Sequence, residues 1–189
     1  MDIRSLATAD FVVEHLVDTK EHRHLLASFS VANNASGLEV YLKRRAMLDE
    51  ASNECRTYLV KDAVSGELAC YFSLRTGLIT VSADDGNFDT IPAAELSNFA
   101  VNASYGAAHR KVGKIGAYVF DKFILPIVKS VSDWIGMQCL YIYALPESRL
   151  ISHYERLGFR RMSDEDAKFV YSHVKPRYDK GCVFMYMFV

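Results

Sequence analysis

Residues 110 to 159 present four features in an order that limits the folds open to this chain. A basic loop containing Gly113 and Gly116 comes first, and apolar residues then recur at four-residue steps from Ile115 to Val131. Such spacing predicts a long helix. A short apolar strand, Leu140 to Ala144, and a helix that ends at Gly158 follow. We therefore expect a mixed α/β fold with one long helix that crosses between two strands.

The middle of the chain is predicted to be rich in strands. Arg56–Lys61 and Glu67–Leu74 alternate with period two around the turn Asp62–Gly66, which predicts an antiparallel hairpin. Pro92–Asn102 is the next expected strand. The other expected strands lie near residues 3–6, 159–162 and 182–189. Helices are expected over 11–29, 38–48 and about 112–134, the last with a kink at Pro126. Pro146 suits the first turn of a further helix, and residues 163–179 should form a polar, partly helical connection.

Composition limits the class of protein. The chain has 189 residues, which suits one domain over 1–189, and its net charge of −1 gives no general attraction to nucleic acid. No apolar run reaches the ~18 residues of a membrane helix, and no signal peptide is evident. The four scattered cysteines lack the paired spacing of a metal site. We expect a cytoplasmic protein with no membrane partner and no metal.

The glycine loop has the chemistry of a phosphate site. Glycines let backbone N–H groups approach a phosphate, the helix dipole adds positive charge, and Arg110, Lys111 and Lys114 add formal charge. A solvated helix start has the same residue types, so the loop by itself leaves both interpretations open. Ile115 follows Lys114 where a P-loop needs Ser or Thr, and a dinucleotide fingerprint is absent.

The whole arrangement resembles the GNAT family of N-acetyltransferases. The family pattern is a strand ending in an Ala-Val-type pair, a loop [Gln/Arg]-x-x-Gly-x-[Gly/Ala] before a helix, and a later Tyr-x-x-x-Gly-Phe. This chain has Ala100-Val101, the loop from Arg110 to Gly116, and Tyr154 to Phe159. The resemblance covers about residues 56 to 162. It implies a GNAT-like α/β (α+β) fold, with a mixed, mostly antiparallel central sheet and helices on both faces, and an acyltransferase that uses acetyl-CoA.

The resemblance also implies which residues bind acetyl-CoA. Phe99, Ala100 and Val101 would hold the pantetheine arm through their backbone. The pyrophosphate would be held by the loop residues Arg110, Lys111, Val112, Gly113, Lys114, Ile115 and Gly116. The loop departs from the family pattern, because Gly113 fits when the motif starts at Arg110 and Gly116 fits when it starts at Lys111. Its register therefore stays open.

Two residues are expected to be catalytic. The resemblance makes Tyr154 the general acid for the departing thiolate; the alternative is a core aromatic beside Ile151 and Leu157. Glu95 lies six residues before Val101 on the same strand face, the offset of the base in the histone-acetyltransferase branch. The alternative for Glu95 is an exposed residue at a strand start, and His109 is a second candidate base.

The amine acceptor is less constrained. The main prediction is a primary amine of a small molecule or peptide. The segments around Tyr41, Tyr58 and Phe72 resemble the toxin-like branch that acetylates aminoacyl-tRNA, so tRNA is an alternative partner. A third alternative is a GNAT-fold protein that binds acyl-CoA without catalysis. The apolar run Val183–Val189 predicts a core strand, and its alternative is the edge of a homodimer.

Overall fold

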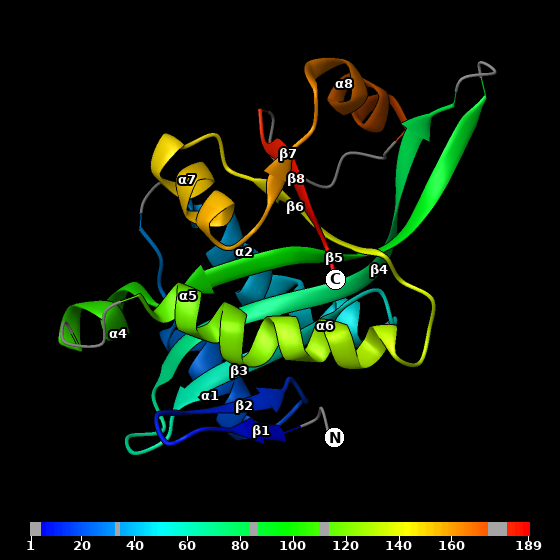
Figure 1. Ribbon diagram of the computed structural model, residues 1–189. Coiled ribbons are helices and arrows are strands. Elements are labelled where there is room, and N and C mark those ends of the chain that lie inside the picture. The colour runs from blue at the N-terminus through cyan, green and yellow to red at the C-terminus, as the bar shows by residue number, and fades with distance from the viewer. Residues whose placement is uncertain (1–4, 33–34, 84–86, 110–113, 174–180) are drawn as a thin grey trace. The chain divides into compact units, whose positions relative to one another are not determined.

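A computed structural model describes residues 5–32, 35–83, 87–109, 114–173 and 181–189. The chain divides into two compact units, one of Met1–Arg75 with Ser97–Ile127 and one of Thr76–Leu96 with Val128–Val189. The described residues form eight strands in the order β1-β2-β3-β4-β5-β6-β8-β7, and β5–β6 is a parallel pair in this mostly antiparallel sheet (Figure 1). This confirms the expected mixed α/β fold class. The assignment of 1–189 as one domain stays a prediction.

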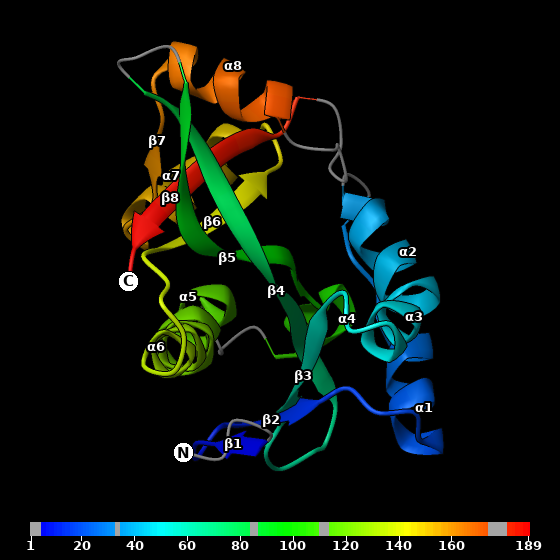
Figure 2. The same cartoon turned by 90° about the vertical axis from the view of Figure 1, so that its right-hand side faces the viewer.

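The first unit contains the N-terminal strands and five helices. Its elements are β1 (Ser5–Ala7), β2 (Phe11–His15), α1 (Lys20–Ser28), α2 (Ser36–Arg44), α3 (Ala46–Ala51), β3 (Arg56–Asp62), α4 (Ala103–Ala108), α5 (Ile115–Val119) and the π-helical segment η2 (Phe120–Ile124). Figure 2 shows α1, α2 and α3 on one side of β3. Leu26, Leu42, Leu59 and Tyr71 form part of the core between these helices and the strands.

Three elements contribute residues to both units, and five belong to the second unit alone. The shared elements are β4 (Leu68–Ser82), β5 (Phe88–Val101) and α6 (Leu125–Ser132). The second unit adds β6 (Cys139–Ala144), α7 (Ser148–Arg156), β7 (Arg160–Arg161), α8 (Asp164–His173) and β8 (Val183–Phe188). Its core includes Ile79, Ala93, Tyr141, Val170 and Phe184. In the part of the chain that the structure describes, no helix is long and apolar enough to cross a membrane.

The expected helix over residues 11–29 is wrong in its first half. Phe11–His15 is a strand that pairs antiparallel with β3, and its buried residues Phe11 and Val13 alternate with more exposed ones. The helix begins only at Lys20, where the Thr19 hydroxyl accepts a hydrogen bond from His22 N–H at 3.1 Å. The apolar residues before Thr19 suit both periods, and pairing with β3 decides in favour of the strand.

The long helix is divided close to the expected place. It starts at Ile115 and passes through η2 before α6, in which Pro126 is the second residue. The Leu125 N–H donates to Phe120 O, the i to i−5 bond of a π turn. Because Pro126 has no N–H and its ring crowds the preceding turn, a widened turn directly before it relieves the conflict. The helix ends at Ser132, shortly before the expected end near Trp134.

The later helices and strands occur where they were expected, but the residues at which they begin and end differ. The hairpin pairs Arg56 with Leu74, but β4 runs on to Ser82. The N-cap of α7 is Glu147, so Pro146 lies one residue before the cap and not in the first turn, where it was expected. Gly158 has φ +100°, which confirms it as the helix C-terminal glycine.

The structure also tests the predictions for the C-terminal apolar run and for the helix over 38–48. β8 pairs with β6 along its length and, at Met185 and Tyr186, with the short strand β7, which confirms a strand inside the sheet. The alternative, the edge of a homodimer, stays a prediction. The 38–48 region forms α2 and then α3, because Arg45 interrupts the helix with φ −116°.

A hydrogen bond between α4 and the β3–β4 hairpin gives a stability prediction. The Tyr105 hydroxyl donates to Asp62 Oδ2 at 2.5 Å. Together with a second hydrogen bond, from the Ser65 backbone N–H, this bond lowers the pKa of Asp62 to about 2. We expect Tyr105→Phe to lower the free energy of unfolding by ~1–2 kcal/mol at pH 7. A carboxylate whose pKa is lower in the folded than in the unfolded state stabilises the fold at pH values above its unfolded pKa. The loss of unfolding free energy caused by Tyr105→Phe should therefore shrink as the pH falls below about 4 towards 2.

Urea unfolding of the wild type and Tyr105→Phe at pH 7, 4 and 3 measures this difference. Asp62→Asn is the matched variant, because it removes the charge from the same pair. If Tyr105→Phe destabilises the wild type and the Asp62→Asn variant equally, the two groups are not coupled and the interpretation fails.

Candidate active site

The end of β5 is held by the side chain of Asn102. Its Nδ2 donates to Leu68 O at 2.7 Å, its Oδ1 accepts from Ser104 N–H at 3.2 Å, and its own N–H donates to Ala69 O at 2.8 Å. The asparagine thus caps α4 and joins the last residues of β5 to the start of β4. Phe99, Ala100 and Val101, the residues predicted to bind the pantetheine arm, directly precede this anchor.

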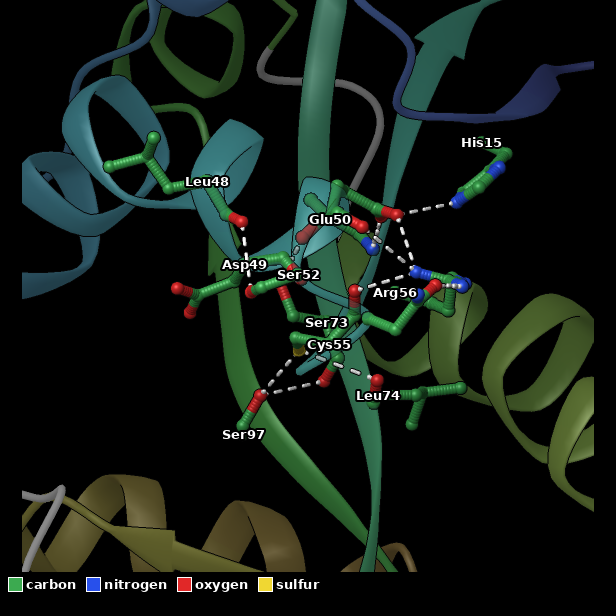
Figure 3. A network of polar contacts seen from close by, with 12 residues as sticks. His15, Leu48, Asp49, Glu50, Ser52, Cys55, Arg56, Ser73, Leu74 and Ser97 are labelled. Carbon is green, nitrogen blue, oxygen red and sulfur yellow. Dashed lines mark hydrogen bonds and ion pairs between the residues drawn. The ribbon is translucent and has the colours of Figure 1, made fainter.

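A polar network supports the same strand on the side of α3. Ser97 Oγ on β5 donates to Ser73 O at 3.3 Å and lies 3.3 Å from the thiol sulfur of Cys55 (Figure 3). Burial raises the pKa of the Cys55 thiol. Because a protonated, buried thiol is a poor nucleophile, this cysteine is structural rather than reactive.

In the same network, Glu50 of α3 forms contacts with residues of the two strands β2 and β3. Its carboxylate accepts hydrogen bonds from the Thr57 N–H and from Arg56 Nη1, the latter at 3.1 Å, and lies 3.0 Å from His15 Nε2 (Figure 3). Three nitrogen partners satisfy a partly buried carboxylate. The helical layer beside β3 and β4 therefore has a fixed position within the first unit.

The predicted pyrophosphate loop is described only in part. Arg110, Lys111, Val112 and Gly113 lie outside the described residues. Lys114 is the N-cap of α5 in the left-handed conformation (φ 63°), and Ile115 is buried at the first helical position. The Tyr118 hydroxyl donates to Thr8 Oγ1 at 3.0 Å, which fixes α5 to the turn between β1 and β2. The first N–H groups of the helix, including that of Gly116, have no acceptor within the helix, the arrangement that suits an anion.

Tyr154 is buried on α7. The side chain is 7% exposed, and its ring lies 5.6 Å from that of Phe159 in an edge-to-face arrangement. Gly158 allows the chain to turn back, and the Phe159 N–H donates to Tyr154 O at 3.1 Å. Burial raises the pKa of the Tyr154 phenol, so the phenol keeps its proton at neutral pH. The catalytic role of Tyr154 stays a prediction.

Glu95 is buried in β5, so the alternative of an exposed residue at a strand start is wrong. It is 5% exposed, and the Tyr141 hydroxyl of β6 donates to its Oε2 at 2.9 Å. The parallel register places Glu95 opposite Tyr141. The sequence predicted Tyr141 only as part of a buried strand, since nothing local to that strand indicates its partner on β5.

His109, the second candidate base, has two contacts in the first unit. Its Nε2 lies 3.0 Å from Glu67 Oε2, and its ring stacks on Tyr105 with 4.1 Å between centroids. These contacts hold the His109 ring at the end of α4, and its role as a base stays a prediction. Within the described residues, no group of three or more His, Cys, Asp or Glu side chains could hold a metal ion.

Solved structures share this fold. No protein-family model matches the chain. A mutant of the AtaT toxin matches with a TM-score of 0.67 at 16% identity, over 96% of this chain and 91% of that one. A KacT mutant matches at 0.63 and 15% identity over 95% of each chain. AtaT complexed with acetyl-methionyl-tRNAfMet matches at 0.64 and 18% identity, over 82% of this chain and 90% of that one. The chain therefore has the GNAT fold of the AtaT and KacT toxins.

Proposed function

We propose that this protein is an acetyl-CoA-dependent N-acetyltransferase that acetylates the amino group of aminoacyl-tRNA. The observation that carries the proposal is the fold match over nearly the full length of both chains. Structures of AtaT with its antitoxin and acetyl-CoA, and of AtaT with acetyl-methionyl-tRNAfMet, support the cofactor and the acceptor class. The proposed acceptor is the tRNA alternative, in place of the small-molecule or peptide amine that was the main expectation.

The residues present suit binding of acetyl-CoA. The backbone of Phe99 to Val101 follows a strand whose end is anchored by Asn102, and the helix start at Ile115 presents N–H groups for a phosphate. We assign the pantetheine arm to the backbone of Phe99 to Val101 and the pyrophosphate to the helix start at Ile115. Acetyl-CoA supplies a thioester, whose carbonyl carbon is the electrophile.

The proposed chemistry is direct attack by the amine. The amine nitrogen forms a bond to the thioester carbonyl carbon, the carbon–sulfur bond breaks, and the amine loses one proton. Glu95 receives that proton, directly or through a water molecule. Tyr154, kept protonated by its burial, gives a proton to the departing thiolate. The products are an acetylated amine and CoA with a free thiol. Proton exchange with solvent then restores the Glu95 carboxylate and the Tyr154 phenol.

Exposed arginines near Tyr154 in the sequence support a nucleic-acid acceptor. Arg149, His153 and Arg156 are spaced i, i+4 and i+7 on α7, so they share one face, and both arginines are exposed. Arg160 and Arg161 on β7 are also exposed. These arginines suit phosphates even though the net charge of the chain is −1. Burial, with the nearby charge of Arg156, lowers the pKa of His153, so this residue adds no charge at pH 7.

Replacing the proposed general acid tests the enzyme. We expect Tyr154→Phe to lower kcat for acetyl transfer to methionyl-tRNA about 100-fold or more, because the thiolate would leave without a positioned proton donor. Release of the CoA thiol, detected with a thiol reagent, gives the rate. Tyr186→Phe on β8 is the matched control and should keep wild-type kcat.

The same assay separates the alternative functions. If CoA raises the melting temperature but no acceptor stimulates thiol release, the protein binds acyl-CoA without catalysis. Turnover with small or peptide amines but not with charged tRNA would refute the tRNA acceptor alone. Unchanged kcat in Tyr154→Phe would remove Tyr154 from the mechanism.

The arginines on α7 give a separate prediction. Each phosphate contact contributes close to one unit to the slope of log affinity against log salt. We expect Arg149→Ala/Arg156→Ala to weaken tRNA binding and to reduce that slope by about 2. Filter binding at several salt concentrations measures it. Lys168→Ala on α8 serves as the control, and a slope identical to that of the wild type would exclude these arginines from the tRNA site.

A further inference from the structure

Glu95 and Tyr141 form a buried pair that the expected chemistry does not require. They are 5% and 6% exposed, lie opposite each other on the parallel strands β5 and β6, and are joined by the 2.9 Å hydrogen bond from the phenol to Oε2. A carboxylate inside a protein needs hydrogen-bond donors to hold its charge. Tyr141 supplies such a donor from a strand, a rigid support.

Gly77 on β4 makes room for the phenol. A Cβ atom at this position would lie 2.2 Å from the Tyr141 hydroxyl oxygen and within 2.9 Å of two ring carbons. Glycine weakens the interior of a strand and often marks a close approach. Here the close neighbour is the phenol that binds Glu95, so any side chain at position 77 would displace the hydroxyl.

Two aromatic rings restrict Tyr141 further. The ring of Phe184 on β8 lies 5.5 Å away at 32°, and that of Tyr143 lies 6.0 Å away at 88°. With the Gly77 backbone close to the hydroxyl end, the phenol has little freedom to leave its rotamer. Its hydroxyl is therefore directed at Oε2 by packing as well as by the hydrogen bond.

We propose that Tyr141 is a positioning residue for the base Glu95, and that Gly77 is required because it leaves space for the phenol. The inference rests on the proposed acetyl transfer. Tyr141 keeps its own proton throughout: its O–H bond directs the carboxylate and supports its negative charge until Glu95 takes the proton from the amine. Tyr141 therefore affects the chemical step and leaves binding of acetyl-CoA unchanged.

Tyr141→Phe is the first test, with acetyl-CoA and methionyl-tRNA as substrates and CoA thiol release as the measurement. We expect kcat to fall ~10-fold, the value of one well-placed hydrogen bond, and KM for acetyl-CoA to stay within about two-fold. Tyr58→Phe makes the same chemical change at a buried phenol on β3 and should leave both constants unchanged.

Gly77→Ala tests the same contact with the phenol and the carboxylate both present. The added methyl group should displace the hydroxyl and lower kcat to about the level of Tyr141→Phe, and the double variant should be no slower than either single one. Circular dichroism and urea unfolding establish that each variant is folded.

A cycle with Glu95→Gln separates positioning from a structural role. If Tyr141 acts through Glu95, Tyr141→Phe should have no further effect on kcat in the Glu95→Gln background. Wild-type kcat in Tyr141→Phe, or an equal loss in both backgrounds, would overturn the inference. A wild-type protein without turnover would instead refute the proposed function, because the inference concerns only the relative rates of an active enzyme.

Discussion

The hydrogen bonds of the Asn102 side chain hold the first unit together at the end of β5. One amide accepts from the N–H that opens α4 and donates to Leu68 O at the start of β4. Its Oδ1 also lies 3.3 Å from the backbone nitrogen of Ser30, which follows α1. A strand end, a helix start and a loop between helices therefore meet on one buried residue. Because each bond satisfies a backbone group with little access to water, replacing Asn102 would leave several such groups unpaired.

The anchor matters for function because of what β5 carries. The residues that we assign to the pantetheine arm end at Val101, and the proposed base lies six residues earlier on the same strand. Side chains at even spacing share one face of a strand. β5 thus carries both the residues assigned to the acyl carrier and the proposed base, and a strand is a better support for a site than a loop.

Much of this architecture could be predicted from the sequence. The hairpin around Asp62–Gly66, the buried strand Leu140–Ala144 and the turn at Gly158 follow from alternation, continuous apolar character and glycine. The predictions of secondary structure are wrong where two local sequence patterns compete. Phe11–His15 has apolar residues that suit a helix, but its partner is β3, and Pro126 signals a break without indicating a π turn.

For the site, the order of the chemical groups could be read from the chain alone: Glu95, Val101, the basic loop and Tyr154. The sequence predicts this order because each motif consists of residues close together in the chain. The burial of Glu95, its donor Tyr141 and the space that Gly77 leaves for the phenol emerged only from the folded chain. These three residues come from three different strands. Strand register joins them, and register depends on long-range pairing that no local pattern encodes.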